Sequence, residues 1–251
     1  MNKTSIKTGT KPSILVPVTS AHPDEALEFI KSTKNREDFD IFELRIDCLT
    51  NALNTELVVN YVSNALKLAH GKRIVLTFRT AQEGGNTFIP PDDYLKLYDA
   101  ILNVAKPEFI DIEFNRGRNC VQRAIEIARK NNISIILSSH DFDKTDSQID
   151  LVNRMEMMRK FDVDVVKMAT MPNTIHDVLN LMAATATMRS RHPGLSLITM
   201  SMGSLGVISR LTGEIFGSDA TFGKIDNSSA PGQIDVSLLK TILEKVDIAV
   251  G

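Results

Sequence analysis

Short apolar runs alternate with longer amphipathic segments along nearly the whole chain. Continuous apolar runs are typical of strands buried on both faces of a parallel sheet, whereas apolar residues at every third or fourth position are typical of helices that cover such a sheet. The predicted strands span 13–19, 41–49, 73–80, 107–114, 134–140, 163–172, 195–202 and 220–225. The predicted helices span about 22–33, 54–69, 91–104, 120–130, 147–160, 174–189, 205–212 and 235–245.

This alternation predicts the fold class. Eight strands alternate with eight helices, and short connections join them. This pattern predicts an α/β fold, a single-domain (β/α)8 TIM barrel. A doubly wound open sheet is the alternative. No Pro- or Ser-rich linker and no block of like charge divides the chain. We therefore expect an N-terminal leader over 1–12 and one barrel domain over 13–251.

The composition of the chain indicates what kind of partner the protein binds and in which cellular compartment it works. The 251 residues include 29 basic and 31 acidic ones, so there is no basic field that would indicate nucleic acid or a membrane surface. No apolar stretch approaches the ~20 residues that span a bilayer, and the N-terminus lacks a signal-type apolar run. Cys48 and Cys120 are far apart and lack metal-ligand spacing. We expect a cytoplasmic protein with a small-molecule partner and no metal.

Lys167 stands out because it lies in the sixth predicted strand, VDVVKMATMP. Val163, Val165 and Lys167 share one side of that strand, and we expect the lysine to be its last inward-pointing residue. Burying an ammonium group without a partner is costly, and the usual outcome is loss of the proton. A neutral amine can form a Schiff base with a substrate carbonyl. The alternative is a lysine that reaches solvent or pairs with a carboxylate.

Other polar residues stand near the carboxyl ends of predicted strands, the end at which barrels carry their active sites. Each of these residues alone could form a structural ion pair or be a core residue with hydrogen-bond partners. Every buried charge adds a desolvation cost, however, so the large number of these residues favours an active site. They are Glu43, Arg45 and Asp47 in the second strand, Thr77 and Arg79 in the third with Glu83 beyond it, Asp111 and Glu113 in the fourth, Ser138 and His140 in the fifth, and Met200 and Met202 in the seventh.

The pair of His140 and Lys167 indicates the chemistry. The two residues end neighbouring predicted strands, which lie ~4.8 Å apart, so both can reach one small substrate. An imine of Lys167 with a ketone acidifies the adjacent C–H bond, and the imidazole can remove that proton and return it to a leaving hydroxyl group. Glu83 could orient the histidine. Candidates for binding a substrate carboxylate are Arg45, Arg79 and Arg210.

A series of short motifs carries a family resemblance. In order they are ELRID (43–47), TFRTAQEGG (77–85), IDIEF (110–114), SSHDF (138–142), KMAT (167–170), MSMG (200–203), ATFG (220–223) and SSAPGQI (228–234). They extend over nearly the whole chain after the leader and resemble those of type I 3-dehydroquinate dehydratase. The resemblance implies conversion of 3-dehydroquinate to 3-dehydroshikimate, a step of the shikimate pathway to chorismate and the aromatic amino acids.

The resemblance also implies a role for each matching residue. Lys167 is expected to form the imine, His140 to act as general acid and base, Glu83 to support the histidine, and Arg210 to bind the substrate carboxylate. Further expected contacts are Glu43, Arg45, Arg79, Ser229 and Gln233, and the expected apolar wall consists of Met200, Met202 and Phe222. Since the family needs no metal or organic cofactor and is commonly dimeric, we expect a cofactor-free homodimer.

Two segments near strand ends raise separate points. The first strand ends in VPVTS (16–20), so no polar contact to substrate can be assigned there. The segment 226–233 is rich in Ser, Gly and Pro and is predicted to form a mobile lid.

Two other functions remain open on these residues. A class I aldolase also places a Schiff-base lysine on a barrel strand, and SMGSLG (201–206) could form a phosphate-binding turn. A non-catalytic sensor of sugar acids is the second alternative, which the presence of both His140 and Lys167 disfavours.

Overall fold

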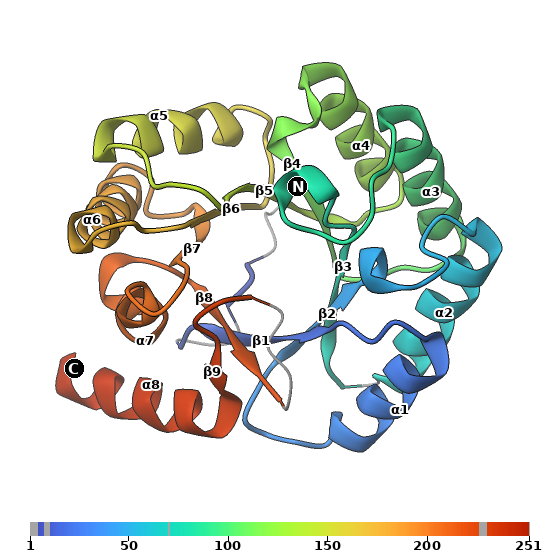
Figure 1. Cartoon of the computed structure of the whole chain (residues 1–251), viewed down its shortest axis with the longest axis horizontal. Coiled ribbons are helices and arrows are strands. Elements are labelled where there is room, and N and C mark those ends of the chain that lie inside the picture. Colours follow the sequence, from blue (N-terminus) through green and yellow to red (C-terminus); the bar gives the residue numbers. More distant parts are fainter. Residues whose placement is uncertain (1–4, 8–10, 70, 226–229, 251) are drawn as a thin grey trace. The chain divides into compact units, whose positions relative to one another are not determined.

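The computed structural model describes residues 5–7, 11–69, 71–225 and 230–250, the last four by their backbone alone. Strands alternate with helices along the chain (Figure 1). The strands are β1 Ser13–Val18, β2 Ile41–Arg45, β3 Arg73–Thr77, β4 Phe109–Glu113, β5 Ser134–Asp141, β6 Val165–Thr170, β7 Ser196–Ser201, β8 Ala220–Lys224 and β9 Ile234–Asp235. The helices are α1 Pro23–Thr33, α2 Thr55–Leu68, α3 Pro91–Val104, α4 Arg118–Lys130, α5 Gln148–Arg159, α6 Ile175–Arg191, α7 Val207–Phe216 and α8 Val236–Val250. Short 3₁₀ turns follow three strands: η1 Ile46–Cys48, η2 Ala81–Glu83 and η3 Phe114–Arg116.

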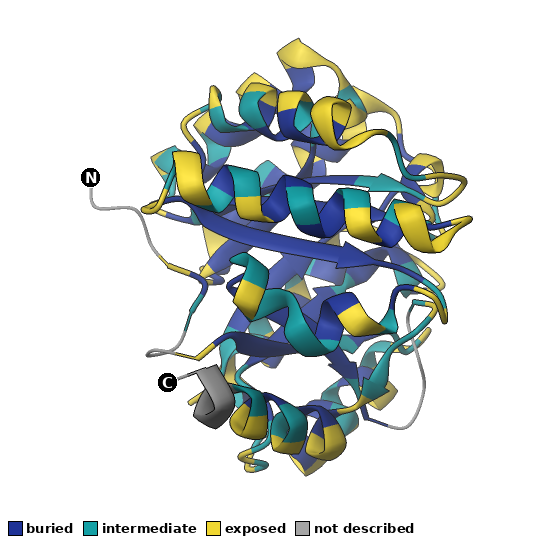
Figure 2. Cartoon of the chain, turned by 90° about the vertical axis from the view of Figure 1, so that its left-hand side faces the viewer, coloured by how far each residue is buried: buried dark blue, intermediate teal, exposed yellow. Residues whose placement is uncertain are grey.

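Burial explains why the apolar pattern predicts these elements well. Strands β4, β6 and β7 are buried at every residue, because helices cover them. The helices are amphipathic, and α4 buries Val121, Ala124, Ile125 and Ala128, which recur every three or four residues. Figure 2 shows buried strands beside helices that carry one buried and one exposed face. Among the described residues no helix is long and apolar enough to cross a membrane.

The chain forms two compact units, each named after one of its residues. The Arg79 unit comprises Pro17–Glu37 and Ile41–Ile136. In it β3 pairs in parallel with both β2 and β4, with Arg45 opposite Thr77 and Thr77 opposite Asp111. The carboxyl ends of these three strands are therefore level, and the polar residues at those ends are brought to one edge.

The Lys167 unit comprises Met1–Val16, Asp38–Asp40 and Leu137–Gly251. Strand β6 lies between β5 and β7, while β8 lies between β1 and β9. Strands β6 and β7 are parallel, with Lys167 opposite Ile198. Strands β1 and β8 are also parallel, with Leu15 opposite Phe222.

Two strands end three or more residues earlier than predicted, and the cause is the polar residues themselves. β2 ends at Arg45 instead of 49, so Asp47 lies in the turn η1 and not on the strand. β3 ends at Thr77 instead of 80, so Arg79 lies in the connection that follows. In both places the backbone leaves the extended conformation because Asp47 accepts a hydrogen bond from the backbone N–H of Arg79 at 3.0 Å.

Two further details correct the sequence-based prediction. Lys167 is not the last residue on its side of β6, because the strand continues to Thr170 and Ala169 follows on the same side. The short strand β9 was not predicted; it pairs with β8, with Ile234 opposite Gly223. A Cβ at Gly223 would lie 2.6 Å from a methyl carbon of Val236, so glycine lets the start of α8 pack closely on β8.

Candidate active site

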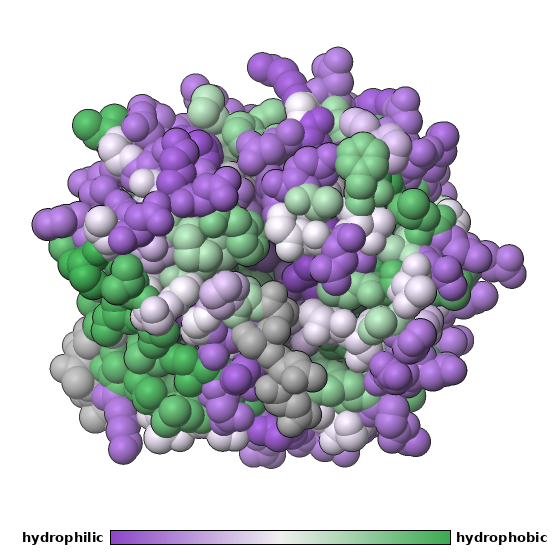
Figure 3. Space-filling model, in the orientation of Figure 1, coloured by the Kyte–Doolittle hydropathy of each residue, from purple (hydrophilic) through white to green (hydrophobic). Residues whose placement is uncertain are grey.

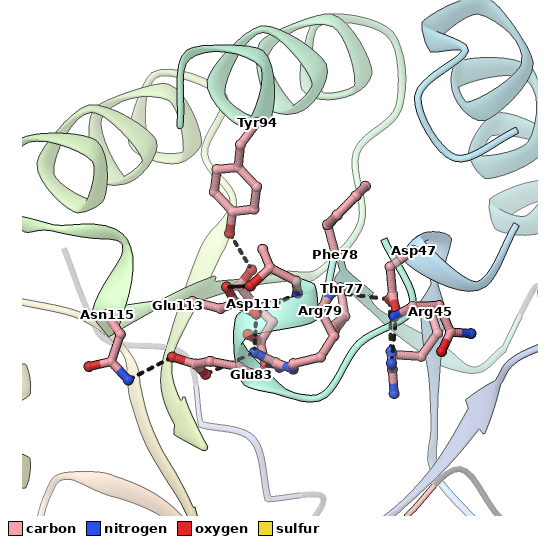
Figure 4. Close-up of polar contacts among 12 residues, drawn as sticks. Arg45, Asp47, Thr77, Phe78, Arg79, Glu83, Tyr94, Asp111, Glu113 and Asn115 are labelled. Carbon is pink, nitrogen blue, oxygen red and sulfur yellow. Dashed lines mark hydrogen bonds and ion pairs between the residues drawn. The ribbon is translucent and has the colours of Figure 1, made fainter. Parts of the chain in front are cut away.

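Arg79 is the centre of a buried polar cluster in the Arg79 unit (Figure 4). The residue is 3% exposed. Its Nη2 atom lies 2.9 Å from Oδ2 of Asp111, and its Nη1 atom lies 3.0 Å from Oε1 of Glu113 and 3.5 Å from Oε2 of Glu83. One guanidinium group thus faces three buried carboxyl groups, more negative charge than it can neutralise.

The excess of carboxyl groups around Arg79 shifts the pKa values in the cluster. Burial alone would lower the pKa of Arg79, but Asp111, Glu113 and Glu83 raise it well above its ordinary value. For Glu83, burial raises the pKa to about 8; Arg79 opposes the shift, and the charges of Glu113 and Asp111 add to it. These shifts keep Arg79 charged and favour the protonated form of the Glu83 carboxyl.

Backbone groups at the ends of β3 and β4 are tied to the same cluster. Thr80 donates its N–H to Oε1 of Glu113 at 2.8 Å and its hydroxyl to Oε2 at 2.7 Å. The Tyr98 hydroxyl donates to the carbonyl of Asp111 at 2.8 Å and accepts the N–H of Phe78 at 3.1 Å. The start of the β3–α3 connection is therefore held to β4 by side chains.

Arg45 forms an ion pair with Asp47. Its Nε and Nη2 atoms each lie 2.8 Å from one carboxylate oxygen of Asp47, a bidentate arrangement that fixes the guanidinium plane. Burial would lower the pKa of Arg45, but the hydrogen bond and charge of Asp47 raise it above its ordinary value. Glu43 accepts the Thr77 hydroxyl at 3.1 Å.

The turn beyond Arg79 leaves no space for a side chain at Gly85. A Cβ there would lie 1.8 Å from the carbonyl oxygen of Arg79 and 3.0 Å from Oδ2 of Asp47. Asp47 also accepts the N–H of Asn86 at 3.3 Å and the Cys48 thiol at 3.8 Å. The carboxylate of Asp47 thus organises the segments after both β2 and β3.

Lys167 lies in the Lys167 unit, on β6, and is 4% exposed. Its Nζ atom stands 4.6 Å from the centre of the Phe222 ring, which comes from β8. His140 is half-buried near the end of β5, the neighbour of β6. The structure therefore brings together Lys167 and Phe222 and places His140 on the adjacent strand.

Arg210, on α7, is 1% exposed. Its Nη1 atom lies 3.6 Å from the sulfur of Met200 and its Nη2 atom 3.1 Å from the carbonyl oxygen of Pro231, while Nε is buried without a hydrogen-bond partner. Burial lowers its pKa to about 10, so it remains charged at neutral pH. Among the residues that the structure describes, no carboxylate forms an ion pair with it.

The remaining predicted residues are placed as follows. Met202 is buried just after β7 and donates its N–H to the carbonyl of Thr170 at 2.8 Å. Gln233 is half-buried just before β9. Ser229 lies outside the described residues, as do 226–228 of the predicted lid.

Asn115, itself an exposed residue, contacts this cluster and was not predicted from the sequence. Its Nδ2 atom donates to Oε1 of Glu83 at 2.8 Å (Figure 4). The signal that could have found it is its position directly after the IDIEF motif, where polar residues meet the carboxyl ends of parallel strands. Within the described ranges, no three His, Cys, Asp or Glu residues are arranged to hold a metal ion.

Comparison with known proteins decides the family. The model of the type I 3-dehydroquinase family matches residues 14–249. The chain belongs to the type I 3-dehydroquinase family. A 3-dehydroquinate dehydratase of Salmonella agona is 40% identical over 206 residues, which are 82% of each chain.

Solved structures agree with this assignment. Type I 3-dehydroquinate dehydratase of Clostridium difficile, determined with covalently modified comenic acid, is 33% identical, with a TM-score of 0.92 over 98% of both chains. The 3-dehydroquinate dehydratase of Enterococcus faecalis is also 33% identical, with a TM-score of 0.87 over 94% of both chains. The predicted family and the predicted α/β fold of the (β/α)8 barrel class are confirmed.

Proposed function

We propose that this member of the type I 3-dehydroquinase family dehydrates 3-dehydroquinate to 3-dehydroshikimate, a hydro-lyase reaction of the shikimate pathway, through an imine on Lys167. The family and the relative of Salmonella agona support the activity. The observation that carries the choice of nucleophile is the amine of Lys167, buried on β6 and held against Phe222. A buried primary amine on a barrel strand is suited to attack a ketone.

The proposed chemistry uses groups of the chain alone. The Lys167 amine adds to the ketone carbon and water leaves, which gives an iminium ion. The imidazole of His140 takes a proton from the adjacent carbon, and the C–H electron pair forms an enamine. The enamine expels the hydroxyl group from the next carbon, and His140 returns the proton so that water departs. Hydrolysis of the remaining imine releases the enone and restores Lys167, so no cofactor is required.

The other predicted residues are proposed to bind substrate or support proton transfer. A buried, charged Arg210 without a carboxylate partner among the described residues is suited to bind the carboxylate of the substrate. Glu83 is proposed to support the proton transfers of His140. Contacts to substrate are assigned to Glu43, Arg45, Arg79, Ser229 and Gln233, and the apolar wall to Met200, Met202 and Phe222.

We also propose a homodimer that forms through one apolar surface of the Lys167 unit. Figure 3 shows hydrophobic side chains gathered over α7 and α8. The surface, called the α6–α8 surface, consists of Ile175, Leu179, Leu205, Ile208, Ile215 and Leu238, each between 41% and 56% exposed. A two-fold dimer buries the same patch on both copies, which suits a surface of this composition.

We further propose a cytoplasmic location, which the free thiols of Cys48 and Cys120 support.

Trapping of the imine tests the central proposal. Incubation with 3-dehydroquinate and borohydride should add one substrate-derived mass to the wild type at Lys167, as read by mass spectrometry of peptides. His140→Ala should still be trapped but should lose about 10²- to 10⁴-fold in turnover. Lys167→Ala should give no adduct, whereas Lys160→Ala, an exposed control, should behave as the wild type.

An adduct at another lysine would overturn the assignment of Lys167. Formation of an enone, followed by absorbance, also separates dehydration from aldol cleavage. Cleavage of a phosphosugar without enone formation from 3-dehydroquinate would contradict the proposed reaction.

A further inference from the structure

Both oxygens of the Glu83 carboxyl are held, but unequally. Oε1 accepts the amide of Asn115 at 2.8 Å, whereas Oε2 lies 3.5 Å from Nη1 of Arg79. The first distance is that of a well-formed hydrogen bond and the second is at its outer limit. The plane of the Glu83 carboxyl is therefore fixed more firmly by Asn115 than by Arg79.

Arg79 contacts two other carboxylates more closely than it contacts Glu83. The same Nη1 atom that faces Glu83 lies 3.0 Å from Oε1 of Glu113, and Nη2 lies 2.9 Å from Asp111. Glu113 is itself held by two hydrogen bonds from Thr80. Because Arg79 is engaged more closely by two other carboxylates, it cannot by itself define where the Glu83 oxygens point.

The turn that carries Asn115 is anchored on both sides. Asn115 lies in η3, directly after β4, while Glu83 ends η2, after the paired strand β3. The next residue, Arg116, donates from Nη2 to the carbonyl of Ile89 at 2.7 Å, and its guanidinium carbon lies 5.1 Å from the centre of the Tyr94 ring. The backbone beside Asn115 is therefore held in place, so the amide of this exposed residue reaches Glu83 from an anchored turn.

We propose that Asn115 is a positioning residue of the reaction, which acts by orienting the Glu83 carboxyl through this hydrogen bond. The inference rests on the proposed function, in which Glu83 supports the proton transfers. An amide is suited to this task because it donates without adding charge to a site where three carboxyl groups already face one guanidinium. It also cannot titrate, so it holds Glu83 whether or not that carboxyl carries its proton.

The first test compares single variants. Asn115→Ala should lower kcat about tenfold with little change in KM, the loss expected for one hydrogen bond of this kind. The imine on Lys167 should still be trapped by borohydride. Asn115→Gln, which keeps an amide donor, should lose less, and Asn119→Ala, an exposed asparagine on the neighbouring helix α4, should match the wild type. A kcat of Asn115→Ala within twofold of the wild type would overturn the proposal.

A pH profile gives a readout that a merely structural role would not move. Arg79, Asp111 and Glu113 are charged groups near Glu83 that shift its pKa, and the hydrogen bond from Asn115 lowers this pKa. Removal of the amide should shift the limb of the kcat profile that depends on Glu83 to higher pH. An unshifted profile in a slowed Asn115→Ala variant would count against action through Glu83.

A double-variant cycle shows whether Asn115 acts through Glu83. If it does, adding Asn115→Ala to Glu83→Gln should cause no further loss of kcat. If Asn115→Ala lowers kcat by the same factor in the wild type and in Glu83→Gln, the proposal is overturned, while the proposed function stays intact. If Glu83→Gln alone keeps the wild-type rate, the proposed role of Glu83 fails, and the inference about Asn115 fails with it.

Discussion

The protonation of Glu83 is linked to the stability of the folded chain. Burial among carboxylates raises its pKa from 4.5 to about 8 in the folded chain. Between these two pH values the folded state holds a proton that the unfolded chain releases, so stability falls as pH rises from about 4.5 to about 8. Below pH 4.5 both states carry the proton and stability no longer depends on this group. Above pH 8 both states have lost it, and the folded state bears the full cost of the buried charge.

Glu83→Gln should therefore stabilise the protein while slowing the reaction. The neutral isostere removes the cost of ionisation, so the free energy of unfolding at pH 7 should rise by roughly 1–3 kcal/mol. Urea denaturation at pH 7 and pH 4.5 measures this difference, which should vanish at the lower pH. Glu126→Gln, at an exposed position of α4, is the control and should change stability little. Equal stability of Glu83→Gln and wild type at pH 7 would show that Glu83 carries no such cost.

Some residue contacts could be predicted from the sequence and others could not. The sequence places Arg79 and Asp111 near the ends of neighbouring predicted strands, and the two are paired. It also places Arg45 and Asp47 near the end of one strand, and these two form a bidentate contact although Asp47 lies in the turn η1. Asn115 was not predicted, since its contact with Glu83 depends on the geometry of two turns.

At the scale of elements, the segment before β9 packs against the turn after β7. The carbonyl of Pro231 accepts the N–H of Gly203 at 3.2 Å and a hydrogen bond from Arg210. Gly232 has φ +80°, and a Cβ there would lie 2.4 Å from the carbonyl oxygen of Gly203. Only glycine fits this conformation and this close approach.

Gly232→Ala should separate these two segments and weaken substrate binding. Because Pro231 would lose its place against Arg210, KM should rise about five- to thirtyfold, the effect of roughly 1–2 kcal/mol, with a smaller change in kcat. Steady-state kinetics measure both constants. Gly194→Ala is the control, since a Cβ at Gly194 would have no atom within 4 Å and its φ is not positive. Unchanged KM in Gly232→Ala would refute a role of this packing in binding.

The apolar pattern predicted the elements but not all their ends. Helix α3 has the predicted bounds, because Pro91 and the first acidic residues mark its start. Strands β2 and β3 end early, where side chains from other segments bind the backbone, and such contacts between distant segments leave no local pattern. Strand β9 has two residues, too few to show periodicity.

At the scale of the whole molecule, the α6–α8 surface predicts the oligomeric state. Ile208→Asp should place a charge within this apolar surface and shift the proposed dimer to monomer. Sedimentation velocity at micromolar concentration measures the change. Ile149→Asp is the matched control, because Ile149 is 72% exposed on α5 of the same unit but lies outside the surface. A monomeric wild type, or a dimeric Ile208→Asp variant, would contradict the proposed interface.

The fold class and family were accessible from the sequence because they depend on features spread over the entire chain. The alternation of strands and helices indicated the former, and the ordered motifs indicated the latter. The α6–α8 surface was not accessible in the same way. Whether an apolar helix residue such as Ile208 faces the core or the outside depends on the packing of neighbouring helices.

The thiol of Cys48 donates to the same carboxylate that holds Arg45, and this has a practical consequence. Burial, together with the negative charge of Asp47, raises the pKa of the thiol to about 12. Almost no thiolate exists at physiological pH, so electrophilic drugs and alkylating labels find a poor nucleophile at this position. Covalent ligands for this enzyme are better designed around carbonyl groups that condense with an amine than around warheads that seek sulfur.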